Sequence, residues 1–145
     1  MSAESDLLGI IKSGGACPAN KLLPLFDQLE PVSAEFMLGT WHGGKFDGGT
    51  EPDPIKWYGK RFVSRTHVEP LLCYAADGSI YSYDKLGVAQ LREVAFNGKV
   101  SASLIYDQHP IMDYFRKVTN DIVLGLGDVK GKPTDFFFHL TRNAA

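Results

Sequence analysis

The chain has few cysteines, no long apolar run and no excess of charge of one sign. Its two cysteines, Cys17 and Cys73, lie far apart without a CxxC pair or metal-type spacing, so we expect free thiols and no zinc site. Lys and Arg total 15 against 17 Asp and Glu, and the basic residues are scattered. This balance argues against nucleic acid or an anionic membrane as a partner.

Targeting segments and several catalytic signatures are also missing. Glu4 and Asp6 stand where a signal peptide carries positive charge, and the apolar residues 7–11 are too few for a secretory or transmembrane segment. We therefore expect a cytoplasmic protein. There is no G-x-S-x-G elbow and no P-loop, and the glycines of "GLGDVKG" have the wrong spacing for a dinucleotide fingerprint.

The hydrophobic pattern changes once along the chain. Within residues 1–31, two stretches have helical spacing of apolar residues and predict two short helices. From Ala34 onward, apolar runs alternate with tight turns about every 8 to 12 residues, which predicts about seven or eight strands joined mainly as hairpins. The strongest turn is Asn97-Gly98, because this pair accepts positive φ at both positions.

Such a meander has two exposed edges unless it closes on itself. We therefore predict a mainly β fold, a small antiparallel up-and-down barrel preceded by the two helices, in one domain of residues 1–145. The interior of a barrel of about eight strands either fills with side chains or holds one small ligand.

The stretch "GTWHG" at residues 39–43 resembles the GxW signature of the calycins, the lipocalin and fatty-acid-binding superfamily. In that superfamily the tryptophan closes one end of the barrel and an arginine of the last strand packs across it, which implies a contact between Trp41 and Arg142. Such a contact contributes about 1–2 kcal/mol when desolvated. Gly39 and Gly43 are expected to let neighbouring segments approach closely.

The five-residue form further resembles the GXWXG family, whose members commonly continue into a C-terminal domain of unknown function. "FMLGTWHGGKFDGG" and "WYGKRF" carry the first resemblance, in residues 34–83. "YDQHPIMDYFRKV", "LGLGDVKG" and "FFFHLTR" carry the second, in residues 84–142. Neither segment has enough strands to close alone, so we expect one barrel built from both. A shorter similarity to the nitrobindins, β-barrels that bind haem, implies haem b as a cofactor.

The strand "IMDYFRKV" offers two alternatives, because residues two apart share a face. If Asp113 faces inward, it is a buried carboxylate that needs a partner such as Arg92, Arg116 or Arg142, and it is a candidate acid or base. If Tyr114 faces inward, Tyr114 and Arg116 form a polar pair in a ligand cavity.

Histidine is the commonest haem ligand, so His109, His67 and His139 are candidates to bind the iron, with Tyr114 as a phenolate alternative. For each histidine a surface or structural role is favoured over metal ligation. If Arg142 faces inward, His139 faces outward. Tyr114 stands where the family more often has histidine. The aromatic residues expected to surround a ligand are Trp57, Tyr58, Phe96, Tyr106, Phe115 and Phe136 to Phe138.

We therefore expect the barrel to bind a small hydrophobic molecule, in the most specific version haem or another tetrapyrrole. The alternative is a cofactor-independent enzyme acting on a small hydrophobic substrate in the same cavity, with Asp113 as acid or base and Tyr114 or Arg116 orienting the substrate. A filled barrel that serves as an interaction module is a third possibility. The sequence leaves open the ligand, the interior face of each strand, and whether the chain forms a homodimer.

Overall fold

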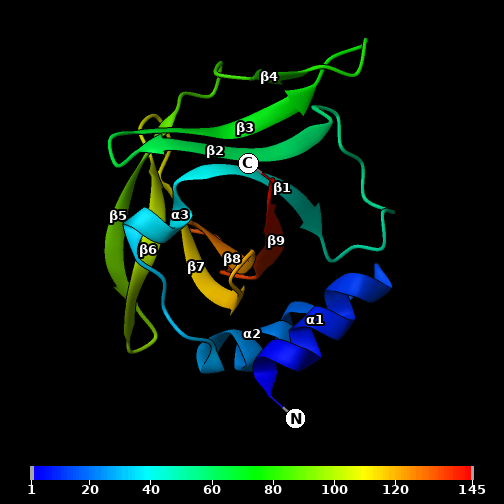
Figure 1. The fold of residues 1–145 in the computed structure, drawn as a ribbon, viewed down its shortest axis with the longest axis vertical. Helices are drawn as coiled ribbons and strands as arrows, with labels where there is room; N and C mark the ends of the chain where they lie inside the picture. The colour runs from blue at the N-terminus through cyan, green and yellow to red at the C-terminus, as the bar shows by residue number, and fades with distance from the viewer. Residues whose placement is uncertain (1, 145) are drawn as a thin grey trace.

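A computed structural model describes residues 2–144 as a closed antiparallel barrel with helices packed on one side (Figure 1). Eight strands form the barrel in the order β2-β1-β9-β8-β7-β6-β5-β3, and pairing of β3 with β2 closes it. The short strand β4 extends from β3 outside the ring. The strands are β1 Gly39–Lys45, β2 Trp57–Ser64, β3 His67–Tyr74, β4 Ile80–Ser82, β5 Ala89–Phe96, β6 Lys99–Tyr106, β7 Ile111–Thr119, β8 Ile122–Val129 and β9 Phe136–Arg142. The prediction of a mainly β barrel is confirmed.

Tight turns set the register of the sheet where the sequence predicted them. Asn97 and Gly98 both have positive φ, at 48° and 82°, and join β5 to β6 with Phe96 opposite Lys99. Strand β1 pairs with β9, so the first and last strands of the barrel are neighbours. Strands from both halves of the chain therefore complete one closed sheet.

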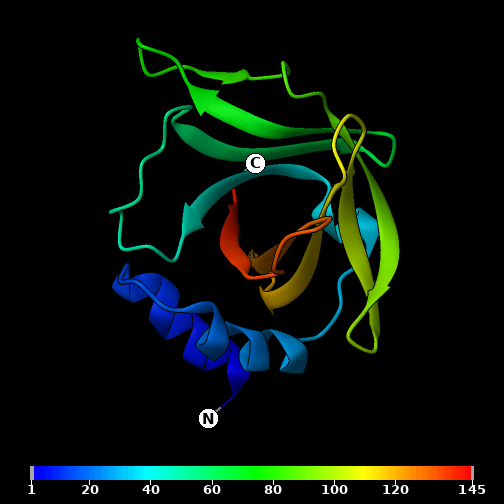
Figure 2. The ribbon, with the colours of Figure 1, turned by 180° about the vertical axis from the view of Figure 1, so that it is seen from behind.

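Two helices cover part of the outer surface, and a third closes one end. α1 (Ala3–Ser13) and α2 (Ala19–Gln28) lie on one side of the barrel, opposite β4, as the two views of Figures 1 and 2 show. α3 (Ala34–Met37) is an additional turn of helix that the sequence analysis did not anticipate, because four residues are too short to show helical periodicity. No helix within residues 2–144 combines the length and hydrophobicity needed to cross a membrane.

Two apolar clusters result from this arrangement. One fills much of the barrel and includes Trp41, Phe62 and Phe115. The other lies between the helices and the outer face of β7 to β9, where Phe26 meets Phe137. Strands β7 and β8 are therefore buried on both faces, which explains why their apolar pattern did not identify the interior.

The closed end of the barrel is held by Trp41 and Arg142. The indole nitrogen of Trp41 donates to the carbonyl of Met37 at 2.8 Å, which attaches α3 to β1. The guanidinium of Arg142 lies 4.3 Å from the centroid of the Trp41 ring. The contact that we expected between these two residues is thus present. The expectation that Gly39 lets a neighbouring segment approach closely is wrong, because a Cβ at this position would meet open space. Glycine is favoured here because its backbone φ is 122°, a conformation that other residues rarely adopt.

Candidate functional site

Of the two alternatives for β7, the structure places Asp113 in the barrel interior. Asp113 is 4% exposed, and Phe115 on the same face packs against Phe62 inside the barrel. Tyr114 and Arg116 consequently face outward, toward the helices. The only acidic side chain in the middle of β7 therefore lies inside the barrel.

The partner of Asp113 is Lys60 of β2, which the sequence analysis did not single out. Lys60 Nζ lies 3.2 Å from Asp113 Oδ2, and both residues are almost completely buried. None of the three arginines proposed as partners takes this place. Arg116 donates to the carbonyls of Phe26 and Phe96, and Arg142 donates to that of Phe36. Arg92 donates to the carbonyls of Arg65 and Leu91. The charge expected to neutralise Asp113 comes from a lysine instead.

A β-bulge explains why the alternation of residues along β2 did not predict Lys60 in the barrel interior. Trp57 and Lys60 both line the interior although they are three residues apart, and in a regular strand such residues lie on opposite faces. The register between β2 and β3 shifts twice between Trp57 and Arg61, where Gly59 faces the backbone of Trp41 so closely that no Cβ fits. The bulge reverses the alternation, and this change has no signature in a two-residue pattern.

The Lys60 ammonium is surrounded by aromatic rings and acceptors. It lies 5.2, 5.5 and 5.7 Å from the ring centroids of Phe138, Trp57 and Tyr106. It also donates to the Pro70 carbonyl at 3.2 Å and to the Tyr106 hydroxyl at 3.3 Å. The indole nitrogen of Trp57 donates to the same carbonyl at 3.3 Å, which fixes the ring beside the ammonium.

Burial and mutual charge shift the titration of all three polar groups. Burial raises the pKa of Asp113, and the positive charge of Lys60 opposes that rise only in part. Burial acts to lower the pKa of Lys60, but the charges of Tyr106 and Asp113 and the hydrogen bond to Tyr106 outweigh it, so the pKa is raised. Burial and then Asp113 raise the pKa of Tyr106 to about 12. At neutral pH Lys60 is therefore an ammonium and Tyr106 a neutral phenol.

These groups line an interior cavity of about 310 Å³. The walls are mainly apolar: Ile55, Trp57, Leu71, Ile111, Val129, Phe136 and Phe138. Polar side chains come from Lys60, Tyr106 and Asp113, and from Lys45 and Asp53. Although Asp113 Oδ2 lies within ion-pair distance of Lys60, it has no hydrogen-bond partner with acceptable geometry among residues 2–144. An unpaired acceptor is thus buried in the apolar site.

The candidate haem ligands lie elsewhere. His139 is on the outer face of β9, against Phe46, and burial and then His42 lower its pKa. His67 lies at the exposed start of β3, 4.0 Å from Glu69, and His109 is exposed in the turn before β7. Each of the four histidines is described by the structure, and none lines the interior cavity.

Tyr114 and Arg116 belong to the helical layer. The Tyr114 hydroxyl donates to Asp128, and its ring stacks on Phe96. Burial and then the Asp128 hydrogen bond raise the pKa of Tyr114, which disfavours the tyrosinate that ligates iron. Arg116 donates to the carbonyls of Phe26 and Phe96 at 3.0 and 2.7 Å, so it joins the end of α2 to β5.

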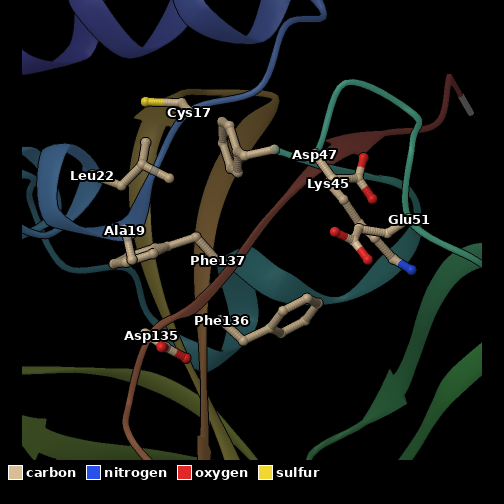
Figure 3. Close-up of a pocket in the computed structure, with 10 residues that line it drawn as sticks. Cys17, Ala19, Leu22, Lys45, Asp47, Glu51, Asp135, Phe136 and Phe137 are labelled. Carbon is tan, nitrogen blue, oxygen red and sulfur yellow. The ribbon is translucent and has the colours of Figure 1, made fainter.

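A second cavity, of about 400 Å³, lies outside the barrel beside the connection between α1 and α2 (Figure 3). Figure 3 shows Phe137 pointing toward Ala19, whereas Phe136 points toward Lys45 and Glu51. Lys45 and Phe136 line this cavity and the interior one. Across residues 2–144 no group of three or more His, Cys, Asp or Glu side chains is arranged to hold a metal ion.

Comparison with known proteins assigns the family. A profile described as GXWXG protein matches residues 24–78, and one described as Domain of unknown function (DUF4334) matches residues 87–142. A crystal structure of a protein from Thermomonospora curvata is 54% identical over 99% of this chain and 100% of that chain, with a TM-score of 0.92. The chain belongs to the GXWXG family. No curated protein matches it.

The GXWXG segment and the C-terminal segment build the interior site together. Residues 24–78 supply Lys60 and Trp57, whereas residues 87–142 supply Tyr106 and Asp113. Neither matched segment contains both members of the buried ion pair.

Proposed function

We propose that this GXWXG protein binds a small, largely apolar ligand in the barrel cavity. The observation that carries the proposal is a cavity with aromatic and aliphatic walls that contains the buried pair of Lys60 and Asp113. Apolar pockets with a few convergent polar groups are typical ligand sites. A buried ion pair contributes little net stability compared with apolar residues of similar volume, so a role in recognition accounts for its place better than a role in folding.

The size of the cavity favours a compact ligand. Its volume of about 310 Å³ lies at the lower end of the range of about 300–1,000 Å³ found for ligand pockets. A molecule of one or two rings suits this space better than a tetrapyrrole. The cavity-lining residues do not fit haem, because the three candidate histidines and Tyr114 all lie outside the cavity.

Substitutions at two neighbouring positions of β7, one facing the cavity and one facing away from it, test the binding site. Ile111 and Met112 are adjacent on β7, and Ile111 lines the interior cavity whereas Met112 packs with the helical layer. We expect p-cresol and toluene to bind the wild-type protein in calorimetric titrations. Ile111→Phe should abolish binding, and Met112→Phe should retain it. Absence of binding to the wild type, or equal binding to both variants, would contradict the proposal.

Haem binding is tested separately by titrating haemin and recording the Soret band. We expect no saturable shift of the band that depends on the cavity. A saturable shift in the wild type that disappears in Ile111→Phe would place haem in the barrel and overturn this expectation.

A further inference from the structure

The unpaired oxygen of Asp113 indicates what the ligand must carry. Asp113 is 4% exposed, and its Oδ2 has no hydrogen-bond partner among the described residues. The nearby Lys60 ammonium donates its hydrogen bonds to the Pro70 carbonyl and the Tyr106 hydroxyl, and it lies 3.2 Å from this carboxylate as an ion pair without a hydrogen bond to it. A buried acceptor without a donor is destabilising, so a ligand that donates a hydrogen bond there is favoured over one that does not.

The charge of the site restricts the ligand further. An ammonium group on the ligand would meet the Lys60 ammonium, which already lies among the rings of Trp57, Tyr106 and Phe138. A carboxylate on the ligand would meet Asp113, whose oxygen is 3.2 Å from the same nitrogen. Since like charges repel strongly where water is excluded, the site selects a neutral group.

A hydroxyl group is the neutral donor that matches the polar side of the cavity. A hydroxyl donates one hydrogen bond and also accepts one. The two polar groups that it would meet are close together, since Asp113 Oδ2 and the Tyr106 hydroxyl lie 3.2 and 3.3 Å from the same atom, Lys60 Nζ. The walls next to these groups are the flat rings of Trp57, Phe136 and Phe138, which suit a ring.

We propose that the ligand is a neutral ring compound with a hydroxyl group, a phenol or a cyclic alcohol, whose hydroxyl donates to Asp113 Oδ2. This inference rests on the binding function proposed above, and it adds the chemical class that the cavity recognises. A hydrocarbon of the same shape fits the walls but leaves the carboxylate unpaired.

The experiment compares p-cresol with 4-methylanisole, which has a methyl group in place of the hydroxyl hydrogen, and with toluene. Calorimetric titrations are run on the wild type and on the double variant Lys60→Met/Asp113→Leu, which replaces the ion pair with apolar side chains of similar length. Such replacements often leave stability unchanged, so the double variant is expected to fold. The wild type should prefer p-cresol over 4-methylanisole, and this preference should fall by about tenfold or more in the double variant.

The outcomes separate this inference from the binding function. An equal preference in both proteins would overturn the hydroxyl assignment while leaving ligand binding intact. Failure of all three compounds to bind the wild type would overturn the binding function itself. Asp113→Asn provides a second variant if the double variant does not fold. It leaves the Lys60 charge unbalanced, so selectivity should shift from p-cresol toward the anion p-toluate. A wild type that binds p-toluate or benzylamine more tightly than p-cresol would contradict the inference.

Discussion

Arg142 of the last strand lies over the indole of Trp41 in the first strand, with Cζ 4.3 Å from the ring centroid. Its guanidinium also donates to the carbonyls of Phe36 and Asn120 at 3.0 and 3.2 Å. The side chain thus joins β1, β9, α3 and the turn between β7 and β8. The family motif closes one end of the barrel, and the ion pair of Lys60 with Asp113 lies in the interior cavity, with Lys60 opposite Trp41 in the sheet.

Replacing Arg142 should weaken this closure. Arg142→Met removes the cation–π contact and the charge-assisted hydrogen bonds, so we expect the free energy of unfolding to fall by about 2 kcal/mol. Urea denaturation measures the change. Lys132→Met removes one positive charge from an exposed turn and serves as the control, with an expected change below about 0.5 kcal/mol. Equal effects in the two variants would show that Arg142 acts only through its charge.

The elements that the sequence predicted well are those set by local chemistry. The Asn97-Gly98 turn follows from the conformational preferences of its two residues, whereas the contact of Trp41 with Arg142 was expected from the resemblance to the calycin motif. The barrel follows because hairpins of this number must protect their edges. These features do not depend on knowing which face of each strand is buried.

The polar site could not be predicted because it depends on which face each strand buries. Both faces of β7 are apolar because the helices cover the outer one. The sequence pattern therefore did not decide whether Asp113 or Tyr114 faces the interior. Lysine is seldom buried, and Lys60 reaches the interior only because the bulge near Gly59 reverses the alternation of β2. Lys60 could be predicted to face the interior only if the position of the bulge were known, because the two-residue period of a regular strand places it on the opposite face from Trp57.

The pairing of Lys60 with Asp113 should appear as strong energetic coupling. Asp113→Leu leaves the ammonium buried without its counter-charge, so we expect a loss of about 3–5 kcal/mol, and Lys60→Met should cost a similar amount. The double variant should lie close to the wild type because neither charge remains. Urea denaturation of all four proteins gives the coupling energy. Additive losses in the double variant would mean that the two side chains do not form an ion pair.

The cavity should also make stability depend on alkaline pH. The pKa of Tyr106 is raised to about 12 and that of Lys60 is raised as well, so both groups hold their protons more tightly in the folded protein than in the unfolded chain. Their contribution to the free energy of unfolding is fully present below about pH 10, and it is lost as the pH rises through the pKa values that the two groups have in the folded protein. For Tyr106 the loss between about pH 10 and 12 is about 2 kcal/mol.

Denaturation curves recorded at a series of pH values measure this dependence. Tyr106→Phe should be less stable at neutral pH, because it loses the hydrogen bond from Lys60, but its stability should fall less steeply above pH 10. Tyr81→Phe, at an exposed position, removes one phenol elsewhere and should leave the wild-type slope unchanged. If the stability of Tyr106→Phe and that of the wild type fall equally steeply above pH 10, the pKa of Tyr106 is not raised in the folded protein.

Gly43 connects the family motif to the cavity, because a Cβ at this position would overlap the ring of Trp57. Gly43→Ala should therefore displace the ring toward the cavity, lower the free energy of unfolding by about 1–3 kcal/mol and weaken p-cresol binding. Gly9→Ala is the matched control: this exposed glycine of α1 has no atom within 4 Å of an added Cβ, and alanine there should raise stability by about 0.5–1 kcal/mol without affecting binding. Calorimetry and urea denaturation measure both effects. Unchanged p-cresol affinity in Gly43→Ala would show that Trp57 is not part of the ligand site.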